Sequence, residues 1–151
     1  MKTLFKGPDG IRTIIFPSML RIIKQSAFYE IKSLKKAVLN EGLEVLGTDE
    51  LRPDNDWYPG VFENSELRDV VFPSTLKGIE YCAFMGCKNL KAVCFPEGLE
   101  YLGTACFLGT GIENIEFPAS LRTISQFSFS ECENLKSAKF AEGLEVLGAD
   151  D

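Results

Sequence analysis

One phrase recurs along the chain and constrains its fold more than any other feature. The segment that starts at Leu76, LKGIEYCAFMGCKNLKAVCFPEG, returns with substitutions from Leu99 and from Leu121, and the same frame fits from Leu20. A short repeat of this kind is typical of a solenoid, because one unit cannot bury its own apolar face and must stack on its neighbours. The sequence therefore predicts one solenoid domain over residues 1–151, with about six turns of 22–23 residues.

Aromatic residues follow the repeat closely. One column consists of Phe5, Phe28, Phe62, Phe84, Phe107 and Phe129, and a second of Phe16, Leu39, Phe72, Phe95, Phe117 and Phe140. Aliphatic residues fill three more columns: Ile11, Leu34, Leu67, Leu90, Ile112, Leu135; Leu20, Leu43, Leu76, Leu99, Leu121, Leu144; and Ile23, Leu46, Ile79, Leu102, Ile124, Leu147. We therefore expect two rows of aromatic rings that lie one over another inside a single coil.

Each turn is expected to hold short strands and tight turns with little helix. The segment Leu90–Phe95 alternates inward residues over its second half, which favours a short strand ended by Pro96. Proline has no N–H to give to a ladder, so it ends strands. Leu99–Leu102 reads as a second extended piece, followed by a corner at the phenylalanine column. Parallel crossovers make such a coil right-handed.

The position after the leucine that opens each turn alternates in charge. The column reads Arg21, Glu44, Lys77, Glu100, Arg122, Glu145. Opposite charges one ladder step apart attract, whereas a slip by one whole repeat would place like charges together. Because exposed ion pairs are weak, we interpret this column as a device that fixes register and discourages wrong association.

One turn carries an insertion. Leu43 and Leu76 are 33 residues apart, and the excess falls at residues 49–60, DELRPDNDWYPG, whose composition is that of a surface loop. Trp57 and Tyr58 are consistent both with a contact site for a sugar or a protein and with cover for the flank of the solenoid. Asp54 and Asp56 lack the spacing of a calcium loop, so no metal site is predicted there.

Composition excludes several functions. The net charge of −6 argues against a nucleic-acid partner, which demands a basic surface, and no apolar run is long enough for membrane insertion. The opening MKTLFKGPDG has no apolar core and is not a signal peptide as it stands. The chain has no histidine, which removes the commonest general base and metal ligand. We expect no enzyme activity, no cofactor and no metal.

The repeat resembles a known family. The pattern formed by Leu76, Ile79, Ala83, Phe84, Cys87, Leu90, Val93, Phe95 and Pro96 is similar to the BspA-like (Treponema-type) class of leucine-rich repeat. This resemblance implies a leucine-rich repeat solenoid, of the right-handed β/α superhelix type, with the strand before the proline on its concave side. It also implies a protein of the cell surface or the extracellular space that serves adhesion and protein binding, with a cytoplasmic location as the alternative. The family position of Cys87 is Ile31 or Thr110 in other turns.

Two columns on the presumed concave face form a candidate binding surface. The outward column after the inward valine reads Ile15, Val38, Val71, Cys94, Glu116, Lys139, which is apolar in its first four turns. Contiguous exposed apolar surface usually marks a contact, although partial cover by neighbouring side chains accounts for it equally well. Beside it runs Arg12, Lys35, Arg68, Lys91, Glu113, Lys136. An acidic partner would relieve the repulsion between these cations, and so would solvent or Asp69.

The five cysteines are read as mainly structural. Cys87 and Cys132 share one position two repeats apart, too far for a disulfide, and Cys106 occupies a column of small residues. Cys82 lies one place before that column. Cys94 should point outward and react first.

Two functions follow from these patterns. The first is a non-catalytic module that recognises a protein or glycan ligand. The second is a structural spacer or self-assembling unit, because both termini stop within a repeat and neither resembles the polar cap that a solenoid needs. A fragment of a longer array and an array whose uncapped ends pair with another copy are both consistent with such ends.

Overall fold

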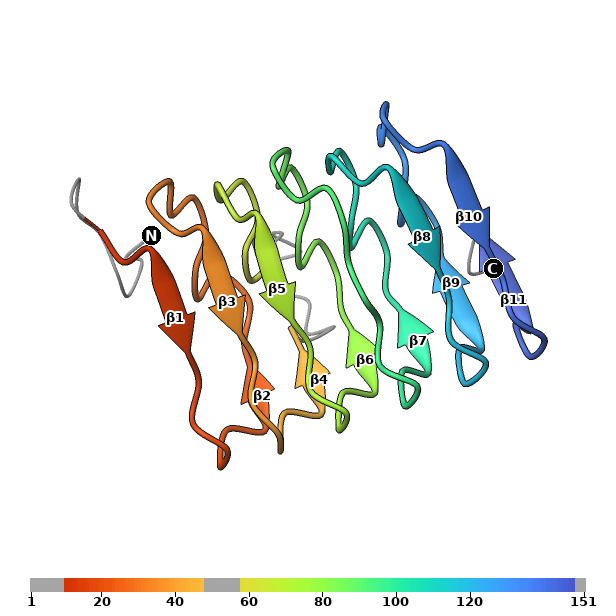
Figure 1. Cartoon of the computed structure of the whole chain (residues 1–151), viewed down its shortest axis with the longest axis horizontal. Coiled ribbons are helices and arrows are strands. Elements are labelled where there is room, and N and C mark those ends of the chain that lie inside the picture. Colours follow the sequence, from red (N-terminus) through yellow and green to blue (C-terminus); the bar gives the residue numbers. More distant parts are fainter. Residues whose placement is uncertain (1–9, 48–57, 149–151) are drawn as a thin grey trace.

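The computed structural model describes residues 10–47 and 58–148, which form a parallel β-solenoid. Successive repeats lie side by side in chain order, from the N-terminal to the C-terminal end of the stack (Figure 1). The residues described contain strands and turns but no helix. The predicted solenoid of short parallel strands is confirmed.

One side of the coil is a six-stranded parallel sheet. Its strands, in chain order, are β2 (Ile22–Ile23), β4 (Val45–Leu46), β6 (Gly78–Ile79), β7 (Tyr101–Leu102), β9 (Thr123–Ser125) and β11 (Val146–Gly148). Each strand pairs with the equivalent strand of the next turn, so that Leu46 lies opposite Ile79 and Ile79 opposite Leu102. This register places a column of aliphatic side chains in the interior at every step.

The other side of the coil is divided into two sheets. A three-stranded sheet contains β1 (Thr13–Ile15), β3 (Lys36–Val38) and β5 (Asp69–Val71), and a two-stranded sheet contains β8 (Asn114–Glu116) and β10 (Ser137–Lys139). Between them the expected strand at Leu90–Phe95 does not form, so that prediction was wrong for this turn. The hydrogen bonds between neighbouring turns are incomplete here. Leu39 N–H donates to Val71 O at 2.9 Å, but in the described residues neither Phe72 N–H nor Phe95 N–H donates an equivalent bond to the next turn.

The corners of the coil depend on residues with a left-handed backbone. Non-glycine residues with positive φ lie two positions before the phenylalanine in four turns: Ser26, Cys82, Ala105 and Phe127. A second set lies two positions after it: Glu30, Asn64, Gly86, Gly109 and Glu131. Only glycine adopts this conformation without steric cost. The tight corner at the phenylalanine column is thus formed by a pair of left-handed residues in four of the described turns, and by Asn64 alone in the turn of Phe62.

The two rows of rings stack as the sequence predicts. In the first row, Phe84 and Phe107 are stacked with centroids 5.0 Å apart, and Phe107 and Phe129 with centroids 5.4 Å apart. In the second row, Phe95 and Phe117 are 6.0 Å apart. The rows meet edge to face, as at Phe95 and Phe107, where the ring planes differ by 69°. Phe62, Phe84 and Phe107 are fully buried, so these rings form the centre of the core. Phe5 lies outside the described residues.

The cysteine at the family position bonds to the turn before it. Cys87 Sγ donates to Phe62 O at 3.1 Å, and Cys132 Sγ donates to Phe107 O at 3.2 Å. All five thiols are free, and all but Cys94 are buried. Burial raises the pKa of Cys87 to about 12 and that of Cys82 to about 11, and it raises the pKa of Cys106 further still.

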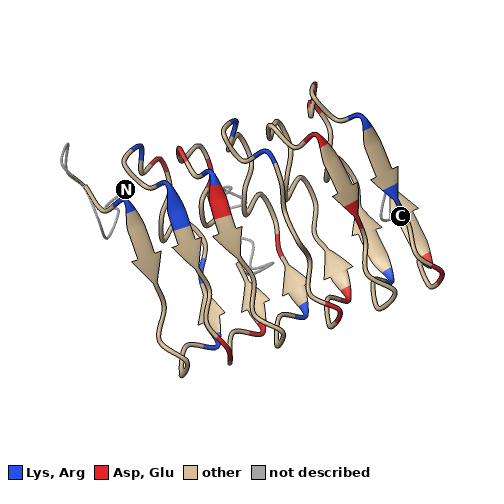
Figure 2. Ribbon diagram, in the orientation of Figure 1, with Lys and Arg blue, Asp and Glu red and all other residues tan. Residues whose placement is uncertain are grey.

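The alternating charged column forms ion pairs. Arg21 pairs with Glu44, Lys77 Nζ lies 3.1 Å from Glu100 Oε1, and Arg122 Nε lies 3.7 Å from Glu145 Oε1. Figure 2 shows positive and negative residues that alternate along the edge where the strands of the six-stranded sheet begin. The predicted pairing of neighbouring turns is confirmed at these three steps, whereas no ion pair joins Glu44 to Lys77 or Glu100 to Arg122.

Candidate binding surface

The apolar stripe, which we define as Ile15, Val38, Val71 and Cys94, lies on the outward side of the divided sheet. Ile15 is 67% exposed, Val71 is 46% exposed, Cys94 is exposed and Val38 is half-buried. Ile15 pairs with Val38, and Val38 with Val71, so the three side chains stand in adjacent turns at one register position. Ile15 and Val71 are thus exposed large hydrophobic residues, whereas Val38 is partly covered.

Alternation along the strands is what exposes the stripe. In β3, Ala37 is fully buried while its neighbours Lys36 and Val38 face the other way. Successive side chains of a strand point to opposite faces, so the column next to the buried one must face outward. Val38 and its equivalents therefore face outward, because the residue before each of them packs against the core, fully buried at Ala37 and partly buried at Ile14, Val70 and Val93.

The cationic row, which we define as Arg12, Lys35, Arg68 and Lys91, runs beside the stripe. Lys35 N–H donates to Arg12 O at 2.8 Å, and Arg68 N–H donates to Lys35 O at 2.9 Å, which fixes these residues one turn apart. Lys35 Nζ lies 3.6 Å from Glu66 Oε2. Within residues 10–47 and 58–148, Arg12, Arg68 and Lys91 take part in no ion pair. Three of the four cations in the row therefore have no ion-pair partner among the described residues.

The same face changes character after Cys94. Lys136 Nζ lies 2.9 Å from Glu113 Oε2, and Lys139 Nζ lies 2.5 Å from Glu116 Oε1. The hydrogen bond from Lys136 lowers the pKa of Glu113, with a smaller contribution from Lys91, and the bond to Glu116 raises the pKa of Lys139. The C-terminal half of the face is thus neutralised by its own ion pairs, whereas the N-terminal half is apolar and cationic.

The end of the insertion is anchored in the stack. Pro59 O accepts hydrogen bonds from Ser26 N at 2.9 Å and from Ser26 Oγ at 3.2 Å. Gly60 N–H donates to Glu63 Oε2 at 2.8 Å, and burial raises the pKa of Glu63. A Cβ at Gly60 would lie 1.7 Å from Cys82 O, so only glycine fits there.

Trp57, Asp54 and Asp56 lie outside the described residues, and Tyr58 is half-buried. The use of Trp57 and Tyr58 as a loop contact, for a glycan or for a protein, stays a prediction.

Two structural features of the surface left no signal in the sequence. One is the break in the sheet at 92–94, because this turn has the same alternating pattern as the others. The other is the contact of Lys35 with Glu66, which joins residues of neighbouring turns outside the charged column that the sequence singles out.

Neither a metal centre nor a membrane span emerges from the residues that the structure describes. This part of the chain contains no group of three or more potential ligands that could hold a metal ion. It also contains no apolar helix of the length that a membrane crossing requires.

The repeat pattern decides the family. A model of the BspA type leucine rich repeat region matches residues 1–51 and 57–150 with 6 copies, so it covers nearly the whole chain. The chain belongs to the BspA-type leucine-rich repeat family. The family repeat is the unit that places the stripe and the row in successive turns.

Solved structures of leucine-rich repeat proteins share this fold. A T. pallidum leucine-rich repeat protein is 23% identical with a TM-score of 0.74, and the match covers 84% of this chain and 57% of that one. A Bacteroides ovatus leucine-rich repeat protein is 22% identical with a TM-score of 0.76, over 91% of this chain and 36% of that one.

A leucine-rich cell surface protein from Faecalibacterium prausnitzii is 24% identical with a TM-score of 0.75, over 87% of this chain and 32% of that one. The chain thus spans about a third to somewhat over half of the length of these structures. No curated protein matches it significantly.

Proposed function

We propose that this BspA-type chain is a non-catalytic module that recognises a partner protein through the apolar stripe and the cationic row. The observation that carries the proposal is the exposure of Ile15 at 67% and Val71 at 46%, next to Arg12 and Arg68, which the described residues leave without an ion pair. Burial of exposed apolar surface is the main source of favourable free energy in association.

The chemistry of the surface points to a partner segment with both apolar and acidic side chains. Neighbouring turns are about 4.8 Å apart, so both columns run along the length of the solenoid at the spacing of paired strands. An extended segment that lies along the stack could bury apolar side chains on the stripe while its carboxylates approach the row. Charge complementarity of this kind directs association on a protein whose net charge is −6.

A location at the cell surface is the second part of the proposal. It is supported by the family resemblance and by the description of one similar structure as a cell surface protein. The alternative is a cytoplasmic module. Fractionation of the source cells, followed by antibody detection with and without external protease, distinguishes the two locations.

Peptide display tests the binding surface. A library of random peptides is selected on the wild-type chain, and we expect the enriched peptides to combine acidic and apolar residues. Their binding should be lost in the double variant Arg68→Glu/Val71→Asp. Lys88→Glu is the control for a charge reversal, because Lys88 is exposed and belongs to neither column. Peptides without acidic residues, or equal loss of binding in the control, would contradict the proposal.

A further inference from the structure

Opposite charges lie on the two sides of the apolar stripe. The cationic row stands three residues before the stripe, whereas Glu41 and Glu97 stand three residues after it, in the turns of Val38 and Cys94. Both glutamates are exposed at the corner where the chain leaves the divided sheet. A strand advances about 3.3 Å per residue, so each flank lies about 10 Å from the stripe. The stripe is therefore the middle line of this face.

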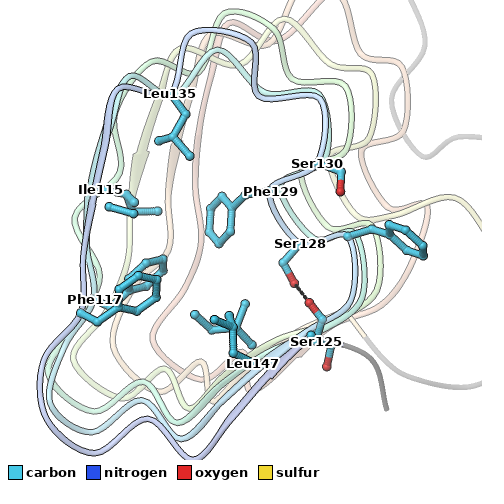
Figure 3. A pocket seen from close by; sticks show the side chains of 13 residues that line it. Ile115, Phe117, Ser125, Ser128, Phe129, Ser130, Leu135 and Leu147 are labelled. Carbon is cyan, nitrogen blue, oxygen red and sulfur yellow. Dashed lines mark hydrogen bonds between the residues drawn. The ribbon is translucent and has the colours of Figure 1, made fainter. Parts of the chain in front are cut away.

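The stripe faces away from the coil in the inner turns. Figure 3 shows Ile115 and Phe117 directed toward the interior of the coil, so the residue between them faces outward. Val71 and Cys94 hold this outward position in two inner turns, and both are exposed. The apolar stripe thus stands at the surface between the cations and the carboxylates.

The charges that flank Cys94 have no ion-pair partner in the described chain. Among the residues that the structure describes, neither Lys91 nor Glu97 takes part in an ion pair. Glu41 is held in place, because its Oε1 accepts from Ser74 N–H and its Oε2 from Ser74 Oγ, both at 2.9 Å. The bond from the Ser74 backbone lowers the pKa of Glu41, so this carboxyl is ionised at neutral pH.

A two-fold axis that runs along the stripe, parallel to the stack, would bring these opposite charges together. Such an axis reverses the direction of the strands but keeps the order of the turns, so each turn faces the same turn of a second copy. The stripe then meets itself, and each cation of the row faces the position three residues after the stripe. Lys91 faces Glu97 of the second copy and Lys35 faces its Glu41, and the symmetry forms each pair twice.

The other contacts of this arrangement are mostly neutral. Arg68 faces Ser74 and Ala92 faces Pro96, so no like charges meet in the turns of the stripe. Farther along the stack, Glu116 and Lys139 each face their own equivalent, and the ion pair between them, at 2.5 Å, reduces the repulsion. An axis parallel to the strands would instead place the cationic row against itself, which disfavours that arrangement.

We propose that this chain forms a symmetric dimer through the stripe, in which the second copy is the apolar and acidic partner that the cationic row binds. The same patch is used on both copies, so the contact closes at two chains. This inference rests on the proposed function, because it names the partner of the same surface.

Exchange of charge between the two flanks tests the proposal. In sedimentation, the average mass of the wild-type chain should rise with concentration to the mass of two chains and no further. Lys91→Glu and Glu97→Lys should each weaken the dimer by about tenfold or more, because each sets like charges against each other twice. The double variant Lys91→Glu/Glu97→Lys restores both pairs and should dimerise as the wild type does.

Lys88→Glu is the control for charge reversal in this experiment, because Lys88 is exposed and belongs to neither flank. All the substituted side chains are exposed, and circular dichroism checks that every variant folds.

Cross-linking provides a second measurement. The proposed axis passes beside Cys94, so a short bismaleimide should join the two Cys94 thiols of a dimer. The other thiols are buried, and Cys94→Ser should abolish the cross-linked product. Lys91→Glu should lower the yield of this product, and the double variant should restore it.

Several results would overturn the dimer. These are a wild-type chain that stays monomeric at all concentrations, a mass that rises beyond two chains, and a double variant that associates no better than the single variants. Equal loss of association in Lys88→Glu would also overturn it. A monomeric chain that still binds the selected acidic peptides would leave the proposed function intact. A chain that neither dimerises nor binds those peptides would contradict both.

Discussion

The inner turns and the last described turn of this solenoid carry the same residue types in the same columns, yet only the inner turns bury them. Leu102 is fully buried and Leu147 is 66% exposed, although both belong to the same aliphatic column and both lie in strands of the six-stranded sheet. An inner turn has a described neighbour on each side, whereas the last described turn has one. Burial in a solenoid is therefore set by the neighbouring turns, as nearest-neighbour models of repeat proteins assume.

The largest expected effect is the loss of an inner ring. Phe84 stacks on Phe62 at 5.4 Å and on Phe107 at 5.0 Å and is fully buried, so Phe84→Ala should lower the free energy of unfolding by about 3–5 kcal/mol. Phe140 stacks only on Phe117 among described residues, so Phe140→Ala should cost about 1–2 kcal/mol. Urea unfolding measures both. Equal losses would show that the neighbours do not set the burial.

A pair of glycines separates backbone strain from packing. Gly47 and Gly148 both follow the leucine of the strand and have φ of +97° and +113°. A Cβ at Gly47 would lie 2.8 Å from the Cβ of Glu80 in the next turn, whereas a Cβ at Gly148 would have nothing within 4 Å. Backbone strain at positive φ should lower the free energy of unfolding of both alanine variants by about 1 kcal/mol. The contact with Glu80 should lower that of Gly47→Ala by about 1 kcal/mol more. Thermal unfolding of the two variants gives the difference, and a larger loss in Gly148→Ala would contradict the contact.

A buried thiol makes the folded state sensitive to alkali. Burial raises the pKa of Cys87 to about 12 from its ordinary value of 9.0. Above pH 9 the unfolded chain releases this proton while the folded chain keeps it, so stability should fall as the pH rises toward 12, by up to about 1.4 kcal/mol per pH unit. When the free energy of unfolding is measured at several values between pH 8 and pH 11, Cys87→Ala should remove this part of its dependence on pH.

Cys94→Ala is the control for that experiment, because the Cys94 side chain is exposed to solvent in the folded chain as well as in the unfolded chain. An unchanged slope in Cys87→Ala would show that the buried thiol does not contribute.

The smallest effect is expected from the alternating charges. Their ion pairs are exposed, as at Arg21 and Glu44 with side chains 72% and 51% exposed, so each contributes about 0–1 kcal/mol. Replacing Glu44, Glu100 and Glu145 together with lysine places like charges in every turn, which should lower the melting temperature or raise self-association. Calorimetry and light scattering check the two outcomes. No change in either would show that the column does not control register.

Much of the fold could be predicted from periodicity, and less of the surface. The aromatic columns predicted the stacked rows, because a residue repeated in phase must meet its copy in the next turn. The same argument placed Ile15, Val38 and Val71 in one outward column. It failed at Leu90–Phe95, where the pattern of a strand is present but the hydrogen bonds to β5 and β8 are not formed. Ladder bonds depend on the exact separation of backbones, which a residue pattern does not encode.

By itself, the sequence determined which side chains face the interior and the order in which the turns stack. It could do so because inward and outward positions follow from spacing along the chain. Only the tertiary structure decided which cations find a partner, which corners take a left-handed backbone and how the Cys87 thiol reaches Phe62 O. Those outcomes depend on distances between adjacent turns, and a few tenths of an ångström separate a bond from a gap.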